Sequence, residues 1–172
     1  FAGAGSENWT PPIKAPTRET VARAAPAEEA APPPPPPPSP DELLDRVYAL
    51  YRHDHNVGVH RPRFDFVADV AGDGTKERVL VHGKDIVVFG KAFKEGTSYV
   101  YITIGVEAPK DVLDATARDV TGDGKAAIIV HGVLHAKASK QMGGKVVDRR
   151  ALYIYQGSEG GLKRIFAAET AR

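Results

Sequence analysis

The acidic residues of one short motif are the best candidates for chemistry in this sequence, because the motif occurs twice. Residues 69–74 (DVAGDG) recur fifty positions later as residues 119–124 (DVTGDG). Each copy is followed by an apolar stretch that ends in Val-His-Gly. Self-similarity at a fixed period is the mark of a duplicated structural unit. The sequence therefore predicts two equivalent units, each with an acidic turn.

The spacing within the first copy matches the front of a calcium loop. In such loops alternate residues supply oxygen ligands, and a glycine at the sixth position permits the sharp turn. Counted from Asp69, Asp73 is the fifth position, the carbonyl of Thr75 the seventh and the carboxylate of Glu77 the ninth. The third position is Ala71, which offers no side-chain oxygen. We expect these residues to form the first ion loop.

The second copy is a weaker candidate for a calcium site. It retains Asp119 and Asp123, but its ninth position is Ala127 and its third is Thr121. So few carboxylates would hold Ca2+ only weakly, at about millimolar concentrations. The alternative for both copies is a tight turn without an ion, in which the first aspartate accepts backbone N–H bonds and the glycines take positive φ.

The motif and the strands around it resemble the FG-GAP or VCBS repeat, an integrin-like calcium-loop repeat of β-propeller blades. The residues that carry the resemblance are 64–90 and 115–133. The resemblance implies acidic loops that bind calcium and an extracytoplasmic location, in the periplasm, at the cell surface or secreted. Two units are fewer than the four to eight blades of a closed propeller. We therefore expect a larger assembly, or two units packed on each other.

The repeated motif lies within a region whose apolar residues alternate with a period of two. Short glycine-containing turns separate the apolar stretches, and such turns join antiparallel strands. We predict a mostly β fold of antiparallel hairpin repeats, propeller-blade-like or an incomplete propeller or sandwich, over residues 64–172, with units at about 64–106 and 113–167. The predicted strands are 64–69, 78–82, 85–89, 98–104, 115–119, 127–136, 146–155 and 162–167.

One amphipathic helix and a proline-rich tail precede the β region. Residues 1–38 hold most of the 14 prolines and are expected to be a disordered Pro/Ala-rich linker, either a spacer or a groove ligand. Residues 39–63 are predicted to be a capping helix and a polar connector, because Ser39, Pro40 and Glu42 form a helix-start signal. The apolar face expected to pack on the β domain is Leu43, Leu44, Val47, Leu50 and Tyr51.

The remaining histidines and basic residues form weaker candidate sites. His53, His55 and His60 follow the helix and are predicted to lie in a solvated connector, with a zinc site as the alternative. His82 and His131 occupy equivalent positions before a glycine turn and are expected to bond neighbouring loops. Basic side chains surround a predicted hairpin tip at 141–145, where they either keep a strand edge soluble or contact a polyanion.

Composition excludes several function classes. The formal charge of +1 argues against nucleic-acid binding, the chain has no cysteine, and no apolar run is long enough to span a membrane. No phosphate-binding or nucleophile-elbow motif occurs. We expect the chain, whose first residue is Phe1, to be a processed or excised part of a longer protein.

The sequence therefore favours a non-enzymatic extracytoplasmic binding or scaffold module with a protein or cell-surface glycan partner. The alternative is an accessory or substrate-positioning domain of a secreted glycan-acting enzyme. Two pairs of alternating tyrosines help to distinguish these interpretations. Solvent-exposed rings would favour contact with a glycan or protein, and buried rings would belong to the core. The four residues are Tyr99, Tyr101, Tyr153 and Tyr155.

Overall fold

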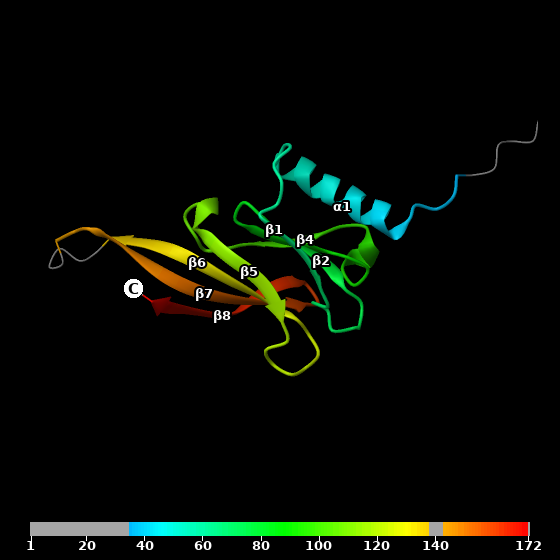
Figure 1. Ribbon diagram of the computed structural model, residues 1–172. Coiled ribbons are helices and arrows are strands. Elements are labelled where there is room, and N and C mark those ends of the chain that lie inside the picture. The colour runs from blue at the N-terminus through cyan, green and yellow to red at the C-terminus, as the bar shows by residue number, and fades with distance from the viewer. Residues whose placement is uncertain (1–34, 138–142, 172) are drawn as a thin grey trace, which may run out of the picture. The chain divides into compact units, whose positions relative to one another are not determined.

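The computed structural model describes residues 35–137 and 143–171. It contains one α-helix and eight strands in two antiparallel sheets (Figure 1). The mostly β fold with one preceding helix is therefore confirmed. The elements are α1 (Pro40–Asp54), β1 (Phe64–Ala68), β2 (Glu77–His82), β3 (Asp85–Phe89), β4 (Val100–Thr103), β5 (Val112–Arg118), β6 (Ala127–Lys137), β7 (Val146–Ser158) and β8 (Gly161–Ala171), with short 3-10 turns η1 (Lys94–Gly96) and η2 (Pro109–Asp111).

Each sheet is an up-and-down meander in which neighbours in sequence are neighbours in space. Sheet A has the strand order β1-β2-β3-β4, and sheet B has the order β5-β6-β7-β8. The two acidic motifs occupy the same topological position, because one links β1 to β2 and the other links β5 to β6. The sequence repeat thus corresponds to the first hairpin of each sheet.

The two sheets share one hydrophobic core. Sheet A contributes β-branched side chains of β2 and β3, and sheet B contributes residues of β6 and β7. Alternate residues of a strand point to opposite faces, so a period of two places these side chains on the facing surfaces. The fully or almost fully buried members include Val79, Val81, Ile86, Val88, Ile128, Val130, Tyr153 and Tyr155. The architecture is a sandwich.

Helix α1 covers the outer face of sheet A. It begins with the predicted capping box, in which Ser39 Oγ accepts from Glu42 N at 3.3 Å and Glu42 Oε2 accepts from Ser39 N at 2.8 Å. Val47 and Tyr51 pack with Leu80, Val87 and Phe89 in a second apolar cluster. The expectation that the helix packs on the β domain is therefore confirmed.

The buried stripe of α1 is narrower than predicted. Leu43 and Leu50, seven residues apart, are 41% and 40% exposed. Tyr48 replaces them at the interface, and its ring stacks on Phe89 with 7° between the ring planes. The sequence pattern showed which residues share a helix face, but the position of the sheet decides which part of that face is buried.

The strand boundaries differ from the predictions mainly in sheet B. Strand β6 runs unbroken through Gly132, in agreement with the predicted strand 127–136, and the glycine turn expected after His131 is not formed. A Cβ at Gly132 would lie 2.9 Å from Val106 Cγ1, so the glycine allows close packing within the sandwich. His131 consequently lies inside a strand and is exposed. Of the predicted hairpin tip, Gly143 and Gly144 form a turn, and 141–142 lie outside the described residues, as does most of the predicted linker.

The packing of α1 predicts a large difference between two neighbouring helix positions. Tyr51→Ala should lower the free energy of unfolding by about 3–5 kcal/mol, because it removes a buried aromatic ring. Leu50→Ala, the control, should change it by less than about 0.5 kcal/mol, because the side chain is half exposed. Urea denaturation measures both. Equal effects of the two substitutions would contradict the docking of α1 through Tyr51.

Candidate functional site

The two acidic loops lie beside each other at one end of the sandwich. The backbone N–H of Ala126, in the second loop, donates to the carbonyl of Asp69, in the first, at 2.8 Å. The Lys125 side chain lies directly against Gly72. The duplicated bends are therefore neighbours in space as well as equivalents in topology (Figure 1).

Each loop is organised by its first aspartate. Asp69 accepts from Gly72 N at 2.6 Å and from Gly74 N at 2.8 Å. Both glycines have left-handed φ, 78° and 83°, which favours a residue without a side chain. A third donor is the N–H of Asp73, at 3.2 Å from the same carboxylate. These bonds fold the first loop around the Asp69 carboxylate.

The second loop repeats this geometry. Asp119 accepts from Gly122 N at 2.7 Å and from Gly124 N at 2.9 Å, with glycine φ values of 76° and 83°. The bond from Gly124, followed by that from Gly122, lowers the pKa of Asp119. Asp123 accepts from Lys125 N at 3.0 Å, and this bond is the main cause that lowers its pKa. Both loops therefore have the hydrogen bonds expected of ordered Asp-Gly turns.

The loops differ at the ninth position, and this difference bears on ion binding. Glu77 is completely buried, its Oε2 accepts from Val70 N at 2.9 Å, and its Oε1 has no hydrogen-bond partner. Burial raises the pKa of Glu77, and the charges of Asp73 and Asp69 raise it further. A cation at this loop would relieve that repulsion. The equivalent residue of the second loop, Ala127, offers no such group.

The structure does not gather all the predicted calcium ligands of the first loop around one point. Thr75 is exposed, and its N–H donates to Asp73 Oδ1 at 2.8 Å. Among the residues that the structure describes, no three acidic or histidine side chains form a group placed to hold a metal ion. The first loop offers a cation one unpartnered carboxylate oxygen, Glu77 Oε1, near the charges of Asp69 and Asp73, which themselves accept backbone N–H bonds. The second loop has Ala127 in place of Glu77 and lacks this oxygen.

The difference between the loops gives a test of calcium binding. Millimolar Ca2+ should raise the melting temperature by roughly 2–5 °C, because occupancy at a few times Kd stabilises the folded state by about 1 kcal/mol. Asp73→Ala should abolish this rise, whereas Asp123→Ala, the equivalent change in the second loop, should retain it. Thermal melts with and without chelator provide the measurement. An unchanged melting temperature in the wild type would leave only the turn role for these residues.

The two tyrosine pairs have opposite environments. Tyr153 and Tyr155 lie in the core between the sheets, where burial raises the pKa of both phenols. Tyr99 is half-buried and Tyr101 is 48% exposed, on the outer face of sheet A. Both pairs alternate identically in the sequence, so only the structure separates the core pair from the open pair.

The last turn of α1 supports the open tyrosines. The His55 ring packs edge-on to Tyr101, with 4.6 Å between ring centroids and 80° between planes. Tyr51 packs edge-on to Tyr99 at 5.3 Å, and Tyr51 lies 4.5 Å from His55. Aromatic rings favour such edge-to-face contacts. Tyr99 and Tyr101 are therefore held in fixed orientations by the helix.

Carboxylates fix the same cluster through hydrogen bonds. Tyr51 donates to Asp85 Oδ2 at 3.1 Å, and Thr103 donates to Asp85 Oδ1 at 2.7 Å. Tyr99 donates to Asp54 Oδ2 at 2.8 Å. This bond is the main cause that lowers the pKa of Asp54, while burial and the bond to Asp54 raise the pKa of Tyr99 to about 12. Asp54 is thus held ionised beside the open rings.

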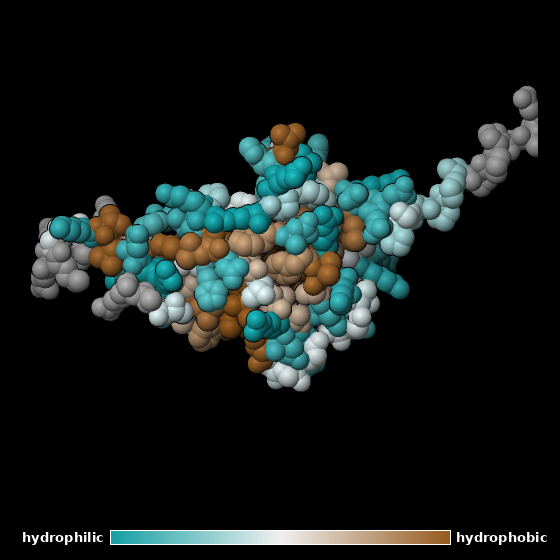
Figure 2. All heavy atoms as spheres, in the orientation of Figure 1, coloured by the Kyte–Doolittle hydropathy of each residue, from teal (hydrophilic) through white to brown (hydrophobic). Residues whose placement is uncertain are grey.

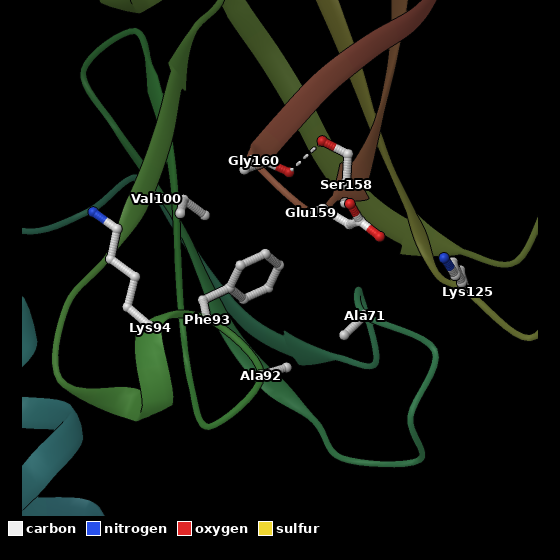
Figure 3. A pocket seen from close by; sticks show the side chains of 11 residues that line it. Ala71, Ala92, Phe93, Lys94, Val100, Lys125, Ser158, Glu159 and Gly160 are labelled. Carbon is white, nitrogen blue, oxygen red and sulfur yellow. Dashed lines mark hydrogen bonds between the residues drawn. The ribbon is translucent and has the colours of Figure 1, made fainter.

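Two hollows lie next to these tyrosines and share part of their walls. The first has a volume of about 430 Å³ and is lined by Asp54, Lys94, Ser98, Tyr99, Val100, Tyr101, Gly160, Gly161 and Leu162. The second, of about 270 Å³, shares Lys94, Val100, Gly160 and Gly161 and continues past Phe93 to Ala71 and Lys125 (Figure 3). We call them the Tyr101 hollow and the Phe93 hollow. Together they border β4 and the β7–β8 turn.

The segment before β4 has an unusual backbone. Lys94 and Glu95 both have left-handed φ, 47° and 56°, although neither is a glycine. Such conformations cost free energy and persist where the surrounding structure imposes them. Thr97 Oγ1 donates to the Lys94 carbonyl at 2.7 Å and ties the segment together. This strained turn forms one wall of both hollows.

The histidines singled out in the sequence are dispersed. His53 is exposed, His55 belongs to the tyrosine cluster, and His82 Nε2 bonds the His60 carbonyl at 2.9 Å. The expected loop contact of His82 is therefore present, whereas His131 is an exposed strand residue. All three residues of the histidine group after the predicted helix were expected to lie in a solvated connector, and this holds for His53 and His60, which are exposed, but not for His55, which packs among aromatic rings.

His135, which no sequence motif singled out, forms the clearest charge cluster among the described residues. His135 Nδ1 lies 2.7 Å from Asp148 Oδ1, and Nε2 lies 3.0 Å from Asp111 Oδ1. The bond to Asp111, then that to Asp148, raises the pKa of His135, and the His135 bond is the main cause that lowers the pKa of Asp111. The only sequence signal would have been strand pairing, since His135 is opposite Asp148 across β6 and β7.

These shifts predict a pH dependence of stability. The His135 contribution should be fully present below its unfolded pKa of about 6.5 and should be lost as pH rises through the higher folded value. The Asp111 contribution should be present above about pH 4 and lost as pH falls through its depressed folded value. In urea denaturation, the free energy of unfolding of the wild type should fall as pH rises through the folded pKa of His135. His135→Gln should remove this fall, and His60→Gln, a change at an exposed histidine, should keep it. The same decline in both variants would exclude His135 as its source.

Comparison of the chain with protein-family models, curated proteins and solved structures gave no match. Among the described residues, no helix is long and apolar enough to cross a membrane.

Proposed function

We propose that this chain is a non-enzymatic extracytoplasmic binding module that presents the tyrosines of β4 to a partner. The observation that carries the proposal is the half-exposed ring of Tyr101 at the edge of a hollow of about 430 Å³. Small-molecule sites commonly have volumes of about 300–1,000 Å³ and combine aromatic walls with a few placed polar groups. The Tyr101 hollow has both features.

The rigidity of the tyrosines supports a binding role. Tyrosine supplies a large contact area with few rotatable bonds, and such residues are frequent among those that dominate binding energy. Here His55 and Tyr51 contact the rings edge-on, and Asp54 accepts the Tyr99 hydroxyl. Little side-chain entropy would then be lost on binding, which favours affinity.

The rest of the fold is consistent with a scaffold for this surface. The sandwich core holds β4, and the strained turn at Lys94 and Glu95 closes the hollows. We assign the first acidic loop a supporting role, in which weakly bound calcium would neutralise its carboxylates and stiffen the loop end. The extracytoplasmic location rests on the resemblance of the two loops to FG-GAP or VCBS repeats.

A second candidate function is a substrate-positioning domain of a secreted glycan-acting enzyme. The observation that favours it is the combination of an open tyrosine ring with the ionised Asp54, since sugars offer both apolar faces and hydroxyl donors. Two clusters of polar groups away from the acidic loops are already engaged in hydrogen bonds, namely His135 between two aspartates and Asp85 between Tyr51 and Thr103. Because these side chains are already hydrogen-bonded to one another, we favour the interpretation that the chain itself is not an enzyme.

Binding to extracytoplasmic material tests the proposed function. Fluorescently labelled wild-type chain should bind the cell-envelope fraction of its source organism saturably, and Tyr101→Ala should weaken this binding by at least about tenfold, as expected for a central aromatic contact. Phe166→Ala is the matched control, because Phe166 is a similarly exposed aromatic residue (47%) on β8, in the other sheet. Equal loss with both variants, or no binding by the wild type, would contradict the proposal.

A further inference from the structure

The Tyr101 hollow combines an apolar platform with a hydrogen-bond acceptor at its edge. The half-exposed ring of Tyr101 supplies the platform, and its T-shaped contact with the His55 ring fixes its orientation. Asp54, which also lines the hollow, accepts the Tyr99 hydroxyl through Oδ2 at 2.8 Å, and its Oδ1 lies 3.4 Å from Nδ1 of the exposed His53 ring. An ionised carboxylate has about four acceptor positions and no donor. Asp54 can therefore accept further hydrogen bonds from a ligand.

This pairing matches the chemistry of a sugar ring. One face of a pyranose consists of C–H groups, which pack against an aromatic face, while its hydroxyls point outward around the ring. A ring stacked on Tyr101 would direct hydroxyl donors toward Asp54 and toward the backbone of Gly160 and Gly161, which also line the hollow. Ser98 adds a hydroxyl that can donate or accept.

The charges around the rings favour a neutral sugar over an acidic one. The charged residues that line the Tyr101 hollow are Asp54 and Lys94. Asp54 is hydrogen-bonded to one of the tyrosines, and its lowered pKa keeps it negative. These two charges are opposite in sign and sum to zero, which matches a neutral ligand. A carboxylate on a sugar placed beside Asp54 would be repelled by it.

The neighbouring hollow indicates a ligand longer than one sugar. The Phe93 hollow shares four lining residues with the Tyr101 hollow, including Val100 of β4 and Gly160 of the β7–β8 turn. Figure 3 shows the Phe93 ring between Val100 and the segment at Ala71, with Ser158 and Glu159 opposite. Because the two hollows share these residues as a common wall, a chain of linked sugars could extend from Tyr101 past Val100 toward Ala71 of the first acidic loop.

We infer that the two hollows form a binding site for a neutral oligosaccharide, with one sugar ring stacked on Tyr101 and its hydroxyls donating to Asp54. This inference rests on the proposed binding function and names the class of its ligand. Affinity should be modest, with Kd on the order of a millimolar for a short oligosaccharide, because the site is shallow and water competes for its hydrogen bonds.

Titration of the full chain with defined sugars tests the inference. The probes are neutral hexasaccharides of glucose, mannose and xylose, with oligogalacturonate as the acidic comparison, and amide chemical shifts are followed by NMR. At least one neutral probe should shift resonances of residues 98–101 and 160–162 saturably. Tyr101→Ala should weaken that binding at least about tenfold, as expected for loss of a dominant aromatic contact. Phe166→Ala should leave it unchanged.

Two conservative variants separate ligand contact from a merely structural effect. Tyr101→Phe keeps the ring and should keep the affinity for the neutral sugar within about threefold, since less than about 0.7 kcal/mol is removed. Asp54→Asn keeps an acceptor for Tyr99 but removes the charge, and it should increase binding of oligogalacturonate. Circular dichroism checks that each variant is folded.

Three results would overturn the inference. They are the absence of shifts with every neutral probe well above a millimolar, tighter binding of oligogalacturonate than of any neutral probe by the wild type, and a neutral-sugar affinity that Tyr101→Ala does not change. If envelope binding depends on Tyr101 while no saccharide binds, the proposed function stands and the saccharide assignment fails. If neither occurs, both fail.

Discussion

The packing of the two sheets against each other is the constraint on which the rest of the structure depends. Each sheet is a four-stranded meander with an apolar inner face, and an isolated sheet of this kind would leave that face in water. Val79 and Val88 of sheet A meet Val130 and Tyr153 of sheet B in one core. The same packing places the two acidic loops side by side and brings the β7–β8 turn next to β4.

The outer faces of the two sheets are covered differently, and this difference explains why the tyrosines of β4 lie in fixed orientations beside a hollow. Helix α1 covers Leu80 and Val87 in the middle of sheet A, and its last turn reaches the tyrosines of β4. Tyr51 is central, since its ring contacts His55 and Tyr99 while its hydroxyl bonds Asp85. On sheet B, Phe166 remains half exposed. Figure 2 shows apolar residues at the surface over the strands of sheet B.

The two copies of the acidic loop share a fold but have different surroundings. Val70 is completely buried, because the first loop packs on β7, where a Cβ on Gly157 would come within 2.7 Å of the Val70 carbonyl. The equivalent Val120 is 47% exposed. The buried Glu77, for which the second loop has Ala127, thus belongs to the loop that is enclosed. Duplication set the turn geometry, and the packing of one copy against the opposite sheet set its electrostatics.

The local features of this protein could be predicted from its sequence. Periodicity of two indicated the strands, Ser39 and Glu42 indicated the start of α1, and the repeated Asp-Gly motif indicated two equivalent bends. These features depend on residues close together in the chain, where backbone geometry and hydrogen bonding act directly. For the candidate site, the sequence marked Tyr99 and Tyr101 as a pair but gave Tyr153 and Tyr155 the same pattern.

Tertiary structure decided which of the two pairs is open, because exposure depends on what lies opposite each sheet face. It also brought Asp111 to His135 from 24 positions away, a contact that local patterns could not indicate. Packing against the sheet also decides which part of the apolar face of α1 is buried, since Leu43 and Leu50 remain about 40% exposed. The sequence by itself determined the elements and their turns, and the packing of those elements determined which side chains meet and which face solvent.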